Sequence, residues 1–111
     1  MGALAEAPAN PWRGEVAITL DGTPRRMRLT LGALAALEAR LGTTSILELA
    51  ERFESGAVST AELLALLSAG LSGAGEPVTE EALANAEIAG GAVGALKAGL
   101  ALMAAAFQPP D

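Results

Sequence analysis

The sequence predicts an α+β fold, in which an N-terminal β-hairpin is followed by a compact bundle of four to five short α-helices. Apolar and polar residues alternate over residues 16–29 with the period of strands, whereas apolar residues after Thr30 recur with the period of helices. The composition agrees, because 51% of the residues are hydrophobic and only 3% are aromatic. A core built from Leu, Ala, Val and Ile suits closely packed helices.

The chain of 111 residues has the length of a single domain, which we place at residues 12–108. Residues 1–11 mix Ala, Pro, Glu and Asn without either hydrophobic period, which predicts a disordered N-terminal arm. Residues 109–111 form a C-terminal tail after the last apolar segment. Only three large aromatic side chains are available to the predicted core, and these are Trp12, Phe53 and Phe107.

The hairpin is predicted from two alternating segments with a turn between them. One face of the first segment carries Val16, Ile18 and Leu20. Residues 21–24, DGTP, supply the turn, because Gly tolerates a positive φ and Asp hydrogen-bonds nearby backbone. In the second segment Met27 and Leu29 alternate with arginines. A two-stranded hairpin is marginally stable alone in water, so we expect the helices to cover its apolar face.

The first two helices have both a start signal and an apolar stripe. Thr30 is the predicted N-cap of a helix over residues 31–41, and Gly42 is its stop. The stripe of this helix consists of Leu31, Leu34, Leu37 and Leu41. Ser45 and Glu48 form a capping-box pattern at the start of the next helix. Its stripe consists of Ile46, Leu49 and Phe53.

Three more helices follow in the second half of the chain. A second capping-box pattern, Ser59 with Glu62, opens the third helix. The buried side of this helix is predicted to be Leu63, Leu66, Leu67 and Leu71. After a glycine-rich loop, Thr79 is the predicted cap of a short helix over residues 80–89. The last helix is predicted over residues 91–107.

The residues that most enzymes use are missing from this chain. It contains no Cys, no Tyr and no His, which removes the usual zinc ligands, thiolate nucleophiles and the commonest general base. Glu80, Glu81 and Glu87 could act as an acid/base pair or bind a divalent ion, but acidic residues at the start of a helix are favoured by its dipole. We therefore expect no enzyme, no cofactor and no metal site. The net charge of −6 argues against binding to nucleic acid.

The stretch from Ile88 to Phe107 is apolar except for one charge, Lys97, and is long enough to span a bilayer. A lysine at its centre and the lack of a basic flank argue against a membrane anchor. Four glycines in or beside this helix are either sites of close packing or the mark of a helix that tightens on a partner, and these are Gly90, Gly91, Gly94 and Gly99.

We interpret this segment as a helix that buries one face in its own domain and offers another to a partner. The predicted partner-binding stripe has spacings of four, three and four, and it consists of Leu96, Leu100, Met103 and Phe107. A stripe of this kind is more often core than interface, but this helix carries more apolar surface than a small hairpin and a few short helices can cover, so both interpretations stay open at this point. The N-terminus has no basic segment followed by an apolar one, which predicts a cytoplasmic protein without a signal peptide.

Three segments of the chain resemble the small tail-assembly proteins of alphaproteobacterial gene transfer agents, a branch of the phage tail assembly chaperones. The most specific is the WRGE hairpin that runs into LTLGALAALEARLG, within residues 10–42. The others are LAERFESG and AEIAGGAVGALKAGLALMAAAF. The resemblance extends from about Asn10 to Phe107 and brings no catalytic motif.

The resemblance implies a chaperone that keeps the tape measure protein soluble in the host cytoplasm while tail tube subunits polymerise around it. The implied partners are the tape measure protein and tail tube subunits, and a homo-oligomer is a further option. A structural tail or head-tail connector subunit that remains in the particle is the main alternative. An enzyme that uses carboxylates and a divalent ion is a more remote one.

Overall fold

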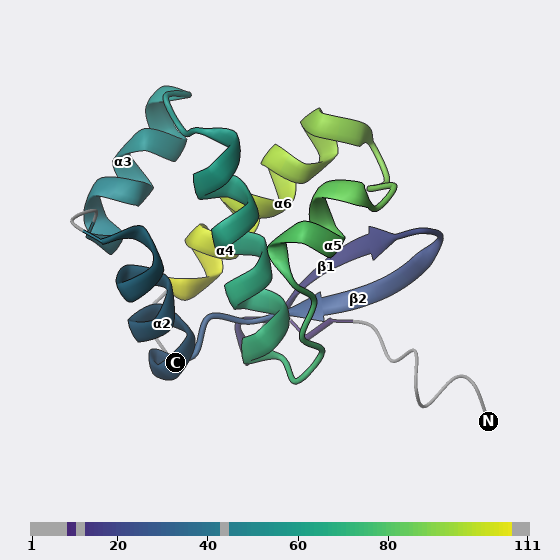
Figure 1. Cartoon of the computed structure of the whole chain (residues 1–111). Coiled ribbons are helices and arrows are strands. Elements are labelled where there is room, and N and C mark those ends of the chain that lie inside the picture. The colour runs from purple at the N-terminus through teal and green to yellow at the C-terminus, as the bar shows by residue number, and fades with distance from the viewer. Residues whose placement is uncertain (1–8, 11–12, 43–44, 108–111) are drawn as a thin grey trace.

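The computed structural model describes residues 9–10, 13–42 and 45–107. The elements named in it are β1 (Val16–Leu20), β2 (Thr23–Met27), α2 (Leu31–Leu41), α3 (Ile46–Ser55), α4 (Thr60–Gly73), α5 (Glu80–Asn85) and α6 (Gly91–Ala106). This arrangement of a hairpin and helices confirms the predicted α+β fold (Figure 1). The predicted C-terminal tail, Trp12 and the N-terminal arm except residues 9–10 lie outside the described residues, and the predicted domain boundaries stay predictions.

The hairpin is tighter than the sequence predicted. Asp21 and Gly22 alone form the turn, with φ angles of 51° and 79°, and Thr23 and Pro24 belong to β2. The predicted turn is therefore confirmed at Asp21 and Gly22, but it is shorter than the predicted residues 21–24. Next to a two-residue turn the first cross-strand pair is hydrogen-bonded and the second is not. Pro24 occupies the second pair, opposite Thr19, where its missing N–H removes no hydrogen bond of the sheet.

The predicted caps begin the helices α2 to α5. In each case the hydroxyl oxygen of the cap accepts a hydrogen bond from a backbone N–H three residues later, and the four caps are Thr30, Ser45, Ser59 and Thr79. At α4 the capping box is complete, because the Glu62 carboxylate also accepts the backbone N–H of Ser59 at 2.8 Å. These local hydrogen bonds explain why the sequence predicted the helix starts well.

The helix predicted over residues 80–89 is shorter than expected, because α5 ends at Asn85. The chain that follows runs beside β1 instead of continuing the helix. The backbone N–H of Asp21 donates to the Glu87 carbonyl at 2.8 Å, and the N–H of Ala89 donates to the Thr19 carbonyl at 3.1 Å. An unpaired strand edge offers backbone partners that local helix signals do not reveal, so tertiary structure overrides the helix here.

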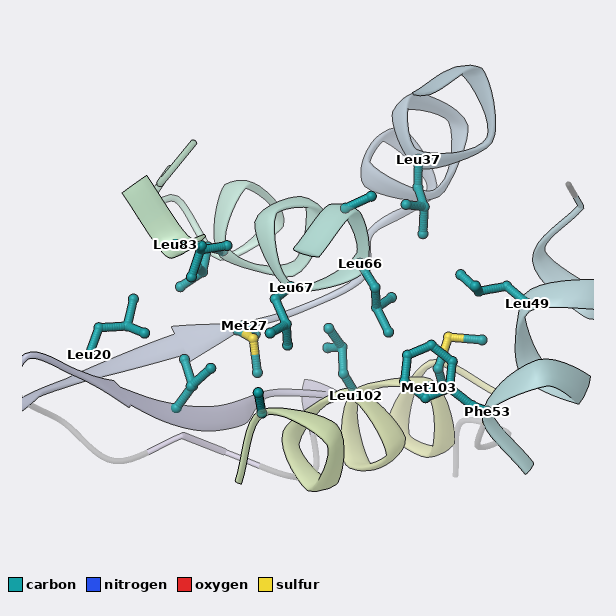
Figure 2. Packing of buried hydrophobic residues seen from close by; sticks show 14 residues of the cluster. Leu20, Met27, Leu37, Leu49, Phe53, Leu66, Leu67, Leu83, Leu102 and Met103 are labelled. Carbon is teal, nitrogen blue, oxygen red and sulfur yellow. The ribbon is translucent and has the colours of Figure 1, made fainter. Parts of the chain in front are cut away.

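The core lies between α4 and the layer formed by the hairpin and α6 (Figure 2). α4 is the central element and contacts α2, β2, α5 and α6. Figure 2 shows Leu66 and Leu67 pointing from α4 toward Met27 and Leu102. The largest fully buried side chains are Met27, Leu37, Leu49, Leu66, Leu67, Leu71, Leu83 and Leu102.

One residue of the predicted α2 stripe faces solvent. Leu31 is 85% exposed, whereas Ala33 and Leu37 form the buried side of the helix. The close approach of α2 to the end of α4 explains why the small residue Ala33 lies on the buried side of α2. A side chain at Gly73 would collide with the carbonyl oxygen of Arg28 and would lie 3.3 Å from the Ala33 methyl group. Only small residues fit at this contact, so the larger leucine is turned outward.

Candidate partner-binding face of the last helix

The turn before α6 directs this helix across the core. Gly90 and Gly91 have backbone φ angles of 84° and 63°, which residues other than Gly rarely adopt. A side chain at Gly94 would collide with the carbonyl oxygen of Ala89. Gly90, Gly91 and Gly94 therefore allow the chain to leave the edge of β1 and enter a helix within a few residues.

The inner face of α6 packs tightly on the rest of the molecule. Its buried residues are Ala95, Gly99, Leu102 and Met103. A Cβ atom at Gly99 would lie 2.8 Å from Cε1 of Phe53, and one at Gly70 on α4 would lie 2.6 Å from Cδ2 of Leu102. Both glycines thus let α6 approach α3 and α4 closely. Of the two explanations for the glycines of α6, close packing fits Gly94 and Gly99.

The outer face of the same helix is apolar as well, although it is exposed to solvent. Five large hydrophobic side chains are exposed in the described part of the chain, and three lie on α6 or at its C-cap. Their exposed fractions are 63% for Val93, 39% for Leu100 and 46% for Phe107. Exposed apolar residues that gather along one stripe are typical of an interaction surface, whereas isolated ones are not informative.

The four residues predicted as a partner-binding stripe are divided between the two faces. Leu100 and Phe107 are exposed, but Met103 is only 4% exposed and Leu96 packs partly buried against the core. Figure 2 shows Met103 among the core side chains. Met103 is therefore a core residue, and the four residues do not form one accessible stripe.

The sequence reasoning missed Val93 and Lys97, which share the exposed face with Leu100. Because α6 is apolar on both sides, two registers satisfy helical spacing, and apolar residues alone do not decide between them. The charge of Lys97 was the signal in the sequence that could have decided between the two registers. A charged side chain remains in water unless it is paired, so the residues three or four positions from Lys97 are the exposed ones.

Lys97 has no ion pair or hydrogen-bond partner among residues 9–10, 13–42 and 45–107. It is the single charged residue of α6. Four of the arginines, by contrast, form ion pairs with glutamates, and these are Arg25, Arg26, Arg40 and Arg52. The outer face of α6 thus combines an apolar stripe with one positive charge that no described residue neutralises, in a protein whose net charge is −6.

The outer edge of β2 is the other surface on which a partner could be expected, and its donors are already used. The N–H of Arg26 donates to Oε2 of Glu76 at 3.3 Å, and the N–H of Arg28 donates to the Gly70 carbonyl at 2.8 Å. Pro24, the remaining outward residue of the strand, has no N–H. This edge therefore cannot donate to an added strand without breaking contacts within the chain.

Carboxylates elsewhere have structural roles. Glu62 is the single charged residue that is buried in the described part of the chain. Its hydrogen bond from the Ser59 backbone N–H, helped by Arg52 at 3.0 Å, lowers the pKa of this carboxyl. Glu80, a candidate for acid/base or metal chemistry, forms a bidentate ion pair with Arg40. Within residues 9–10, 13–42 and 45–107, no group of three or more acidic residues is placed to hold a metal ion.

The helices of the described residues are also too short or too polar to cross a membrane, α6 included. In a comparison with protein families, the model of the family described as phage tail tube protein, GTA-gp10, matches residues 13–109. No curated protein and no solved structure matches the chain. The match confirms the resemblance to a tail protein of gene transfer agents, while its description does not include the role of a tail assembly chaperone.

Proposed function

This chain belongs to the family of phage tail tube proteins, GTA-gp10, and we propose that it acts in tail assembly by binding a helical segment of a second tail protein. The observation that carries the proposal is the outer face of α6. Val93, Leu100 and Phe107 form an exposed apolar stripe on a helix whose opposite face is locked into the core. A helix held in this way can bind a partner without first paying the entropic cost of becoming ordered.

The hairpin supports a helical mode of binding over strand addition. Tail proteins that assemble by extending a β-sheet need free strand edges, and a partner strand forms its hydrogen bonds there. In this chain the donors of β2 are bonded to Glu76 and Gly70, and the end of β1 pairs with residues 87–89. The apolar face of α6 needs no such rearrangement, so it is the more accessible surface for a partner.

The tape measure protein is our proposed partner, because tape measure proteins of such particles are largely helical and apolar. In this role the chain would protect apolar helices of the partner from aggregation until the tube has formed around them. The protein would act by binding alone, in the host cytoplasm, without a cofactor.

The family description favours a second candidate, a structural subunit that remains in the finished tail. Such a subunit would use the same apolar face, but against neighbouring tail subunits. The two roles predict different amounts of this chain in the finished particle, since a chaperone leaves the particle and a subunit remains in it. The composition of purified particles therefore distinguishes them.

The test is co-expression of the chain with the tape measure protein of the same gene transfer agent. We expect co-purification and a higher soluble yield of the tape measure protein. Leu100→Asp should weaken binding at least about tenfold, because a carboxylate in the apolar stripe must be desolvated. Leu47→Asp is the matched control, since Leu47 is 67% exposed on α3 and the charge change is the same.

Both variants should unfold cooperatively, like the unmodified chain, because both positions are exposed. Equal loss of binding in the two variants would contradict a specific role of α6. Failure to bind the tape measure protein, combined with stoichiometric presence of the chain in finished particles, would favour the structural subunit.

A further inference from the structure

The exposed residues of α6 have the spacing of a coiled-coil seam. Val93, Lys97, Leu100, Ala104 and Phe107 follow one another at intervals of four, three, four and three residues. This spacing repeats every seven residues, with Val93, Leu100 and Phe107 at one core position of the heptad and Lys97 and Ala104 at the other. All five residues are exposed, so we call them the outer seam.

The inner face of α6 agrees with the register of the outer seam. Of its four buried residues, Ala95, Gly99 and Leu102 fall at heptad positions opposite the seam, and Met103 falls at a position beside it. The helix therefore has two separate faces, one used by the core and one that matches a partner helix. Two heptads are too short for an independent coiled coil, but α6 is already fixed by its own domain.

Lys97 is the second of the five residues of the outer seam and its single charged one, and its charge restricts what can pack there. A partner helix that covers the seam removes the ammonium group from water, which is unfavourable unless a carboxylate meets it. A single lysine at a core position of a coiled coil specifies partner and register at a cost in stability. Lys97 therefore favours a partner helix with an acidic residue at the facing position.

The same argument disfavours pairing of α6 with α6 of a second copy. Within Gly91–Ala106 there is no acidic residue that could meet Lys97 of the other copy. A parallel symmetric pair would instead bring two lysines near each other within an apolar seam, where the repulsion is poorly screened. An antiparallel pair centred on Leu100 would place Lys97 opposite Ala104, where no carboxylate of α6 could meet it. The charge pattern thus points to a different chain and not to a homodimer through this helix.

We propose that the outer seam binds an amphipathic helix of another protein that carries one Asp or Glu facing Lys97, and that this ion pair selects partner and register. The proposal rests on the proposed function, because it specifies the partner helix of the same face. Lys97 acts as a specificity-determining residue, whereas Val93, Leu100 and Phe107 supply the apolar contact.

The test uses two synthetic amphipathic peptides of 21 residues that differ only at the centre of their apolar face, which carries Glu in one and Lys in the other. Binding of each labelled peptide to the full chain is measured by fluorescence anisotropy at low salt. We expect the Glu peptide to bind about tenfold more tightly, and this preference to shrink as salt is added. Lys97→Glu should reverse the preference.

Arg28→Glu is the matched control, because Arg28 is exposed, lies outside α6 and changes the net charge by the same amount. It should leave the preference for the Glu peptide within about twofold. Equal affinity for the two peptides, or reversal by Arg28→Glu, would overturn the inference. So would an oligomer of the free chain that Leu100→Asp dissociates, since the occupant would then be a second copy.

The test is independent of the proposed function. If neither peptide binds while the tape measure protein still co-purifies with the chain, the inference about the seam is wrong and the proposed function stands. If the Glu peptide binds selectively but no tail protein binds, the inference about the outer seam stands and the proposed partner is wrong.

Discussion

The hairpin edge and the outer face of α6 are both surfaces where a partner could bind, but they differ in how far the chain satisfies them itself. At the outer edge of β2, Glu76 binds the backbone N–H and the guanidinium of Arg26, and Gly70 accepts the N–H of Arg28. At the outer seam of α6, three large apolar side chains and Lys97 remain exposed to solvent.

This difference shows where binding energy is still available. Backbone donors that are already hydrogen-bonded gain little from a new partner, because one hydrogen bond only replaces another. Exposed apolar surface, by contrast, gains free energy whenever it is removed from water. The hairpin is consequently a structural element, and the last helix is the surface that is prepared for a second protein.

The largest expected effect sharpens the contrast between the two faces of α6. Leu102→Ala should lower the free energy of unfolding by about 2–5 kcal/mol, because Leu102 is fully buried and the truncation leaves a cavity. Leu100→Ala, two residues earlier, should cost about 1 kcal/mol or less. Urea unfolding followed by circular dichroism measures both. Similar losses for both variants would mean that Leu100 also belongs to the core.

A second effect tests the close approach of α6 to α3. Gly99→Ala should destabilise the protein by about 1–3 kcal/mol, since the new methyl group would lie 2.8 Å from the Phe53 ring. Gly32→Ala is the matched control in α2, where the nearest atom is the Thr30 hydroxyl oxygen at 3.9 Å. That variant should be more stable by about 0.5–1 kcal/mol. A stabilising Gly99→Ala would show that α6 is packed loosely.

A third prediction concerns Glu62. Its carboxylate accepts the backbone N–H of Ser59 at the start of α4, as the Glu76 carboxylate accepts that of Arg26 at the outer edge of β2. The pKa of Glu62 is lowered in the folded protein, chiefly by the Ser59 backbone N–H. The contribution of the charged carboxylate to the free energy of unfolding is thus fully present at a pH above the ordinary pKa of 4.5, and it is lost as the pH falls through the lowered pKa. Glu62→Ala should cost about 1–2 kcal/mol at pH 7.

At a pH below the lowered pKa, the difference in stability between Glu62→Ala and the unmodified chain should become smaller. Thermal unfolding at a series of pH values measures this change. Glu48→Ala is the control, because its side chain forms no complete capping box with Ser45. A Glu62→Ala cost that stays constant with pH would contradict the role of the charged carboxylate.

The smallest effect tests whether the hairpin edge is closed by Glu76. Glu76→Gln should change stability by no more than about 1 kcal/mol, because the ion pair of Glu76 with Arg26 is partly exposed to solvent and such pairs contribute little. It should nevertheless speed hydrogen exchange at the Arg26 amide, whose N–H the Glu76 carboxylate accepts. Glu81→Gln serves as the control, since Glu81 lies on the exposed side of α5. Unchanged exchange at Arg26 would show that another group protects this edge.

Local signals in the sequence predicted much of this fold. The caps Thr30, Ser59 and Thr79 act within four residues, so they do not depend on the rest of the molecule. The alternation in β1 likewise places Ile18 and Leu20 in the core, as predicted. The end of α5 was wrong, because residues after Asn85 pair with β1, which is distant in sequence.

The sequence by itself determined that the last helix is apolar on more than one side and carries one charge. Only the tertiary structure decided which side the core uses. Met103 is buried and Val93 is exposed because Gly99 and Gly70 allow α6 to approach α3 and α4 on one face. Helical spacing is satisfied by either face, whereas close packing selects one, and the face left over is the candidate binding surface.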